Sequence, residues 1–168
     1  MQKEVEQLIN HLIHIEHLST TLYLAMSAYL GKLNYTGMAS WLKIQSDEER
    51  MHLLRLINYL VDRDGTVKIK ALEAQPSDFG TPAETFEKVF EHEKFVTDSY
   101  RQAYPFAQSV DSQTAVIIQD FLREQTEEVA QAQKIYNRLK IAGPDGAAIL
   151  LIDQELGQRQ PVITLAQG

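Results

Sequence analysis

Residues 47–52 read DEERMH, and the fold prediction starts from this stretch. Glu49 and His52 are three positions apart, so on a helix they share one face. On an exposed face the pair is an ordinary solvated patch, which is the commoner meaning of an isolated Glu-x-x-His. On a buried face it places a carboxylate and an imidazole, two strong metal-ligand types, inside a core. The rest of the chain decides between the two.

The surrounding sequence is helical in its pattern. One stripe recurs at spacings of three and four through Leu42, Gln45, Glu49, His52, Leu56 and Tyr59. Comparable stripes occur in three other segments, so we expect long helices over residues 3–31, 36–62, 82–105 and 112–142. Pro82 suits a first helical turn, Pro105 should kink or end the third helix, and Asp111 or Ser112 should cap the fourth.

The connections between these segments favour a bundle. Residues 64–81 contain glycine and proline and have no sustained period, and a connection of this length can cross a whole bundle. A short fifth helix is expected over about residues 144–156, before an irregular tail at 157–168. The prediction is an all-α single domain over residues 1–168. It is a four-helix bundle (residues 3–142) with a long crossover between its second and third helices and a short C-terminal helix.

Composition excludes several classes of protein. The 168 residues are 44% hydrophobic and 23% charged, and the formal net charge of −7 argues against nucleic acid as a partner. The absence of cysteine excludes disulfides, zinc–thiolate sites and iron–sulfur clusters. No apolar run approaches the roughly 20 residues that span a bilayer. The N-terminal residues do not resemble a secretion signal. We therefore expect a cytoplasmic protein without a membrane partner.

Each long stripe is interrupted near its middle by glutamate, at positions Glu16, Glu49, Glu93 and Glu128, and His52 joins on the second helix. Any one of these residues alone can be a solvated charge. Together they place four carboxylates at one depth, and burying even one unpaired carboxylate costs several kcal/mol. Cations between them would compensate that charge. Carboxylates with one imidazole favour iron or manganese, so two divalent irons are the natural occupants.

Two further features accompany this pattern. Tyr23 lies seven residues after Glu16 on the same face, where it can hydrogen-bond a ligand or donate an electron. A core tyrosine with a satisfied hydroxyl is the commoner explanation, and both stay open. Three further glutamates lie one position or one turn from the inner ligands and can form a third, weaker metal site; they are Glu48, Glu124 and Glu127.

Five segments carry a resemblance to a known family. They are IEHLSTTLYLAMSAY, SDEERMHLLRLINYL, FEHEKFVTDSY, FLREQTEEVAQ and LLIDQEL. Over about residues 5–156 the chain resembles a ferritin of the non-haem bacterial type. The resemblance implies a shell of 24 subunits. Such a shell oxidises Fe²⁺ with O₂ or H₂O₂ and stores a ferric mineral. Bacterioferritin fits less well, because its haem-ligating Met is replaced here by Arg50, so no haem is expected.

The resemblance also implies roles for individual residues. The first iron would be held by Glu16, Glu49 and His52, and Glu49 would bridge to a second iron. The second iron would also be bound by Glu93 and Glu128. Gln125 and Tyr23 match residues beside this centre. The third iron site would comprise Glu48, Glu124 and Glu127, with Glu128 shared.

Two alternatives of other classes remain at this point. One is a di-iron oxidase or peroxidase of the same superfamily that acts on a substrate other than iron. The other is a structural shell subunit without an active centre.

The positions that match the acidic three-fold channel of animal ferritins are Ala115 and Ile118, so the usual route of iron entry is not predicted.

Overall fold

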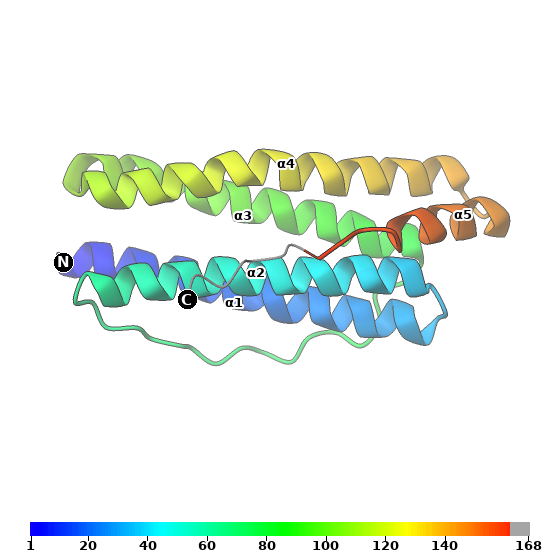
Figure 1. Cartoon of the computed structure of the whole chain (residues 1–168), viewed down its shortest axis with the longest axis horizontal. Coiled ribbons are helices and arrows are strands. Elements are labelled where there is room, and N and C mark those ends of the chain that lie inside the picture. The colour runs from blue at the N-terminus through cyan, green and yellow to red at the C-terminus, as the bar shows by residue number, and fades with distance from the viewer. Residues whose placement is uncertain (162–168) are drawn as a thin grey trace.

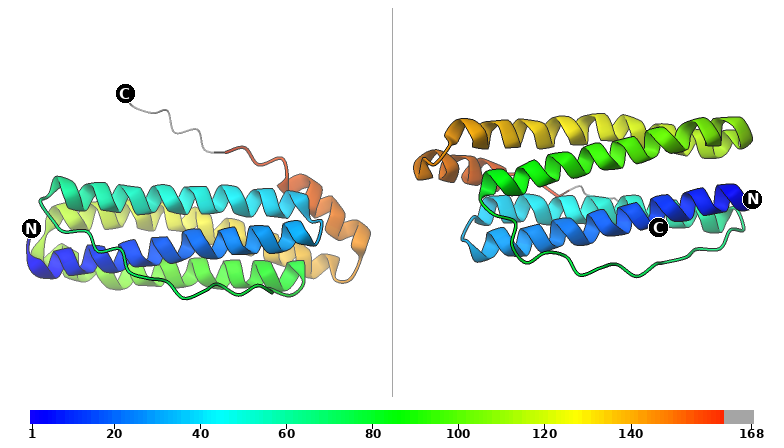
Figure 2. Two further views of the ribbon diagram at one scale, coloured as in Figure 1. Left: turned by 90° about the horizontal axis from the view of Figure 1, so that it is seen from below. Right: turned by 180° about the vertical axis from the view of Figure 1, so that it is seen from behind.

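The computed structural model describes residues 1–161, which form five helices and no strand (Figure 1). In chain order these are α1 (Lys3–Lys32), α2 (Thr36–Asp62), α3 (Pro82–Val110), α4 (Ser112–Ala142) and α5 (Gly146–Leu156). The four long helices lie lengthwise beside one another, and α5 packs at one end of the bundle (Figures 1 and 2). The predicted all-α bundle is confirmed. None of these helices is both long and apolar enough to cross a membrane.

The predicted crossover between α2 and α3 runs the length of the bundle beside α1 (Figure 2). Near the start of α1, the Asn10 amide donates to the Thr66 carbonyl at 2.9 Å, and the Lys68 amide donates to the Asn10 side chain at 2.6 Å. Near the other end of α1, the Tyr29 hydroxyl donates to the Gly80 carbonyl at 2.8 Å. These bonds hold an otherwise irregular segment to α1, so the second pair of helices can run in the required direction.

The starts of α3 and α4 follow from local chemistry. Thr81 and Glu84 form a capping box at α3, and Asp111 accepts from two backbone amides at the start of α4. Pro105 does not end α3, which continues to Val110, so the expectation of a helix end there was wrong. The carbonyl four residues before Pro105 lacks its helical donor, but it belongs to an exposed turn where water can serve it.

The apolar core consists of two clusters, one towards each end of the bundle. On α1, for example, buried members of one cluster end at Ile15 and those of the other begin at Tyr23. The interval between the clusters falls at residues 16–22, 43–55, 90–95 and 122–131 of the four long helices. All four predicted glutamates lie in these intervals. The carboxylates therefore share one level of the bundle, with apolar core on either side.

The short helix α5 is docked on the start of α2. The Asp153 carboxylate accepts from the Met38 backbone amide at 2.7 Å. A Cβ on Gly37 would lie 1.7 Å from the Asp153 carbonyl oxygen, so only glycine permits this approach. The contact directs the chain after α5 back towards α2. The returning chain places Arg159 beside Gln45 and Glu48, near the level of the four glutamates.

Candidate metal centre

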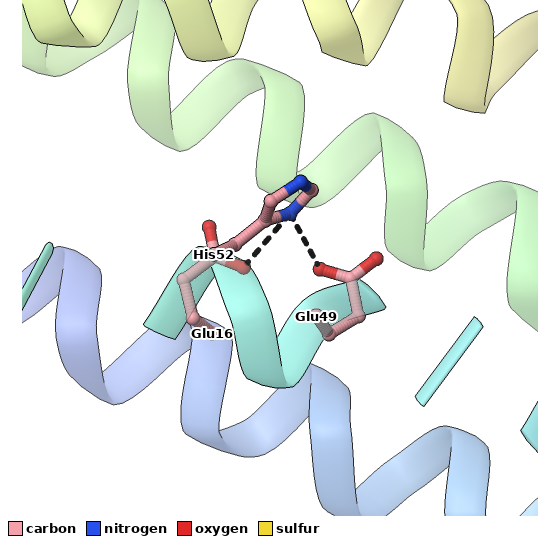
Figure 3. Close-up of side chains that lie close together, drawn as sticks. All are labelled: Glu16, Glu49 and His52. Atoms are coloured by element: carbon pink, nitrogen blue, oxygen red, sulfur yellow. Dashed lines mark hydrogen bonds and ion pairs between the residues drawn. The ribbon is translucent and has the colours of Figure 1, made fainter. Parts of the chain in front are cut away.

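Glu16 from α1 and Glu49 and His52 from α2 converge inside the bundle (Figure 3). Each offers a ligand atom within 4.8 Å of the other two. The His52 Nδ1 lies 3.4 Å from a Glu49 oxygen and 3.8 Å from a Glu16 oxygen. Glu16 is 0% exposed and Glu49 is 1% exposed. The solvated interpretation of DEERMH is therefore excluded, because this face of α2 is buried.

The surroundings of Glu16 suit the binding of a cation. One oxygen of its carboxylate accepts a hydrogen bond from the Tyr100 hydroxyl. The other, Oε2, is buried and has no hydrogen-bond partner. A buried oxygen without a donor is costly, and a cation at this point would remove the cost. Burial raises the pKa of Glu16 well above its usual range, and the nearby charge of Glu49 raises it further.

His52 supplies the compensating charge when no metal ion is bound. Burial disfavours its charged form, but hydrogen bonds to Glu124 and Glu49 outweigh burial and raise its pKa to about 11. Burial likewise acts to raise the pKa of Glu49. The hydrogen bond and charge of His52 outweigh that effect, with help from Gln45, and lower this pKa below its ordinary value. In the metal-free protein, His52 is thus an imidazolium beside the Glu49 carboxylate, and a metal ion that binds there replaces the proton.

A second contact orients His52. Its Nε2 lies 3.1 Å from a Glu124 oxygen, and Glu124 also accepts from Arg55 at 2.7 Å. When Nε2–H donates to Glu124, the neutral imidazole keeps its lone pair on Nδ1. Nδ1 is the atom that faces the two buried carboxylates. Glu124 therefore acts on His52 as the carboxylate partners of metal-binding histidines do.

Glu93 on α3 is held by two donors. The Tyr23 hydroxyl donates to one of its oxygens at 2.6 Å, and the Gln125 amide donates to the other at 3.3 Å. Burial raises the pKa of Glu93 well above its usual range, and the charge of Glu49 adds to this. The Oε1 atom of Gln125 is itself buried without a hydrogen-bond partner. The two predicted neighbours of the centre, Tyr23 and Gln125, thus both contact Glu93.

Glu128 on α4 is linked to α2 through Gln45. The Gln45 amide nitrogen lies 2.8 Å from a Glu128 oxygen and 3.1 Å from a Glu49 oxygen. Burial raises the pKa of Glu128 to about 7, and the nearby charge of Glu49 contributes to the rise. Glu93 and Glu128 stand outside the three-residue group around His52. They face that group from the opposite pair of helices.

The residues proposed for a third site line a depression of about 380 Å³ between α2 and α4, together with Glu128 and His52. Glu127 is exposed there. Glu48 is instead paired with Arg159 at 2.5 Å, and Glu124 is paired with Arg55 and His52. Within residues 1–161, these three glutamates do not meet closely enough to form a second ligand group. The third site therefore stays a prediction.

Sequence reasoning assigned no site role to three residues that the structure places here. Gln45 stood in the predicted stripe of the second helix, one turn before Glu49, and Tyr100 falls within the predicted third helix. A polar residue in a stripe that is expected to be buried, next to a proposed ligand, was the signal that could have identified Gln45 as part of the site. Arg159 lies beyond the last helix, where no periodicity predicts its position. Its contacts depend on how the chain turns after α5.

Comparison with known proteins identifies the family of the chain. The ferritin-like domain family matches residues 6–142. The bacterial non-haem ferritin of Bacteroides fragilis (strain 638R) is 38% identical over 160 residues, which cover 95% of this chain and 99% of that protein. That of Staphylococcus aureus (strain MRSA252) is 32% identical over 160 residues, with 95% and 96% covered.

Solved structures agree as well. An open-pore ferritin from the hyperthermophilic archaeon Archaeoglobus fulgidus superposes with a TM-score of 0.92 at 34% identity, and the match covers 95% of this chain and 98% of that one. An engineered closed form of the same archaeal ferritin also has a TM-score of 0.92, at 35% identity, with the same coverage. Sequence, fold and the level of the four glutamates lead to one conclusion: the chain belongs to the ferritin family.

Proposed function

We propose that this chain is the subunit of an iron-storing and iron-detoxifying ferritin, and that each subunit oxidises Fe²⁺ to Fe³⁺ at a paired site inside its bundle. The observation that carries the proposal is the single level of four glutamates, one from each long helix, with His52 beside them; Glu16, Glu49 and Glu93 are buried, and Glu128 is half-buried. Hydrogen bonds satisfy these groups incompletely, since Oε2 of Glu16 has no donor. Such a set of ligands suits iron better than soft-ligand metals.

Iron is the substrate in this reaction. Glu16, Glu49 and His52 would bind the first Fe²⁺, and Glu49 would bridge to a second that Glu93 and Glu128 also bind. Two Fe²⁺ lose one electron each, and O₂ takes both electrons with two protons to become H₂O₂; alternatively, H₂O₂ takes two electrons and two protons to become two waters. The Fe³⁺ then moves to a mineral inside the shell.

The protein supplies position, dryness and proton exchange. Tyr23 and Gln125 hold Glu93, while Tyr100 holds Glu16. Apolar clusters on both sides of the level keep bulk water away from the three buried carboxylates, Glu16, Glu49 and Glu93. A metal ion that binds Nδ1 of His52 must displace a proton, because this pKa is about 11 in the metal-free protein. Iron uptake therefore releases protons.

The proposal includes assembly. Large apolar side chains are exposed on the single chain, notably Leu24, Ile69, Phe95, Phe106, Val116, Ile141, Leu150 and Leu151. Apolar surface of this kind suits burial between subunits. We propose that 24 copies form the hollow shell, in the cytoplasm. Light scattering of the purified protein tests the size of the shell directly.

The experiment is stopped-flow absorbance. Fe²⁺ is loaded anaerobically at about two per subunit, the stoichiometry of a paired site, and O₂ is then added. We expect a fast oxidation phase that is lost in His52→Ala. His11→Ala is the matched control, because His11 is an exposed histidine of α1 and has no part in the centre. A shell of full size that shows no fast phase, or a fast phase that survives in His52→Ala, would overturn the assigned centre.

The main alternative is a di-iron oxidase acting on another substrate, which requires a substrate pocket next to the metals. A depression of about 440 Å³ between α3 and α4 has Gln125, a neighbour of Glu93, in its wall. That observation gives the alternative a specific location. A small oligomer together with slow iron oxidation would favour it, whereas a large shell that builds a ferric mineral excludes it.

A further inference from the structure

The chain after α5 returns towards α2 (Figure 1). A hydrogen bond to the Trp41 carbonyl places Arg159 against that helix. The Arg159 guanidinium lies over the Trp41 ring, 4.4 Å from its centroid. Its Nη1 donates to the Trp41 carbonyl at 3.3 Å and to Gln45 Oε1 at 2.9 Å, and its Nη2 donates to Glu48 at 2.5 Å. Aromatic stacking and a fork of donors hold the guanidinium in one orientation.

The contact with Gln45 reaches the candidate centre. A glutamine side chain has one end that only accepts and one end that only donates. Arg159 has only donors, so it binds the oxygen end of the Gln45 amide. The nitrogen end is then directed to Glu49 and Glu128, at 3.1 and 2.8 Å. Arg159 thus determines which end of Gln45 faces the carboxylates.

The contact with Glu48 concerns the predicted third site. Glu48 is half-buried, and burial raises the pKa of its carboxyl, while the charge of Arg159 opposes that rise. The depression beside Glu48 contains three further glutamates: Glu124, Glu127 and Glu128. A cation that used Glu48 as a ligand would meet the positive guanidinium on the same carboxylate. Binding of the two cations is therefore competitive.

We propose that Arg159 is a positioning residue that acts as a tethered cation. While Arg159 is docked on Trp41, it directs Gln45 towards Glu49 and Glu128 and prevents Glu48 from binding a metal ion. When Arg159 leaves, Glu48 becomes a ligand and the third site opens. The relevance to iron rests on the proposed function, whereas the competition at Glu48 does not.

Trp41 provides a direct reporter of docking, because it is the one tryptophan among the 168 residues. Removal of the guanidinium in Arg159→Ala should change its fluorescence emission. The matched control is Arg138→Ala, because Arg138 also pairs with a glutamate, Glu155, and its loss changes the net charge equally. The emission of Arg138→Ala should equal that of the wild type. Light scattering verifies that each variant still assembles.

Zn²⁺ titration of the metal-free shell by calorimetry tests the competition. Arg159→Ala should bind about one further Zn²⁺ per subunit, since a freed glutamate beside other carboxylates is a metal ligand. The added site should disappear in the double variant Arg159→Ala, Glu48→Gln. Equal stoichiometry in wild type and Arg159→Ala would overturn the competition, as would an added site that persists in the double variant.

Arg159→Lys separates the two parts of the proposal. A single ammonium can neutralise Glu48, but it lacks the planar fork that serves Gln45 and Glu48 together. We expect wild-type Zn²⁺ stoichiometry and, with iron, an oxidation rate about 10-fold lower, the usual effect of a lost supporting contact. A wild-type rate in Arg159→Lys would refute positioning through Gln45. If wild-type shells show no fast oxidation at all, the proposed function fails, and the Zn²⁺ and fluorescence results still decide the role of Arg159.

Discussion

Tyr100→Phe is a demanding test of the argument that the buried carboxylates are incompletely satisfied. Tyr100 is fully buried, and its hydroxyl is the hydrogen-bond donor to Glu16. Its ring stacks on Phe121 with centroids 5.0 Å apart, a contact that phenylalanine would preserve. The substitution therefore removes a donor and little else. Because Oε2 of Glu16 already lacks a partner, the variant leaves a buried carboxyl group with no hydrogen-bond donor at either oxygen.

The expected magnitude follows from that geometry. A buried polar group left without its partner costs about 1–3 kcal/mol, and more if it is charged. The metal-free variant should therefore be destabilised by about 1–3 kcal/mol. A bound cation contacts the same carboxylate and replaces the lost donor. Saturation with Zn²⁺ should consequently reduce the difference in unfolding free energy between the variant and the wild type.

The assay is urea unfolding at pH 7, followed by far-UV circular dichroism, with and without Zn²⁺ at equal protein concentration. Tyr136→Phe is the matched control, because Tyr136 also donates to a glutamate, Glu87, but in an exposed position. It should unfold at the wild-type midpoint. If Tyr100→Phe is no less stable than this control, or if Zn²⁺ does not reduce the difference from the wild type, the reasoning about Glu16 is refuted.

Two further predictions concern the elements that position the centre. Gly37→Ala should detach α5 and expose it to early proteolysis, because the new Cβ would lie 1.7 Å from a carbonyl oxygen of α5. Gly31→Ala is the control, because the nearest atom to its new Cβ is 3.6 Å away, and it should be cleaved no faster than wild type. Asp111→Ala should cost about 0.5–2 kcal/mol at pH 7 through the lost helix cap, measured against its exposed neighbour Ser112→Ala. Burial acts to raise the pKa of Asp111, but hydrogen bonds from Thr114 and Arg63 outweigh burial and lower this pKa. The loss of stability in Asp111→Ala should therefore be complete above the pKa of the unfolded chain, near 3.8, and should vanish as pH falls through the lower pKa of the folded protein. A difference that persists unchanged in acid would contradict this assignment.

The bundle could be predicted from the sequence because helix periodicity and helix ends are features of neighbouring residues. The stripe through Glu49 and His52 identified α2 over its observed length, and Pro82 marked the start of α3. Pro105 shows where a local rule failed. A proline near the end of a long helix removes one hydrogen bond, and packing of Ala103 and Ala107 into the core keeps the helix intact around it.

The candidate centre could be predicted only in part. One glutamate per stripe gave the level of Glu16, Glu49, Glu93 and Glu128 without any structure. The hydrogen-bond donors could not be assigned in the same way, because each joins residues far apart in sequence. Tyr100 reaches a carboxylate 84 positions away. The return of the chain after α5 depends on the docking of α5 against Gly37, so Arg159 was beyond reach of any periodic pattern.

The donors explain how such a charged core can fold before it binds metal. Without a cation, His52 carries a proton, and the raised pKa values of Glu16 and Glu93 favour their neutral forms. Protons thus reduce the buried charge that would otherwise oppose folding. Tyr23 and Tyr100 each satisfy one carboxylate oxygen and leave room for a metal ion. A core satisfied by additional donors would be more stable, but a metal ion would then have to break those bonds. Incomplete satisfaction is therefore the property that permits a folded metal-free subunit and, under the proposed function, leaves carboxylate oxygens available to iron.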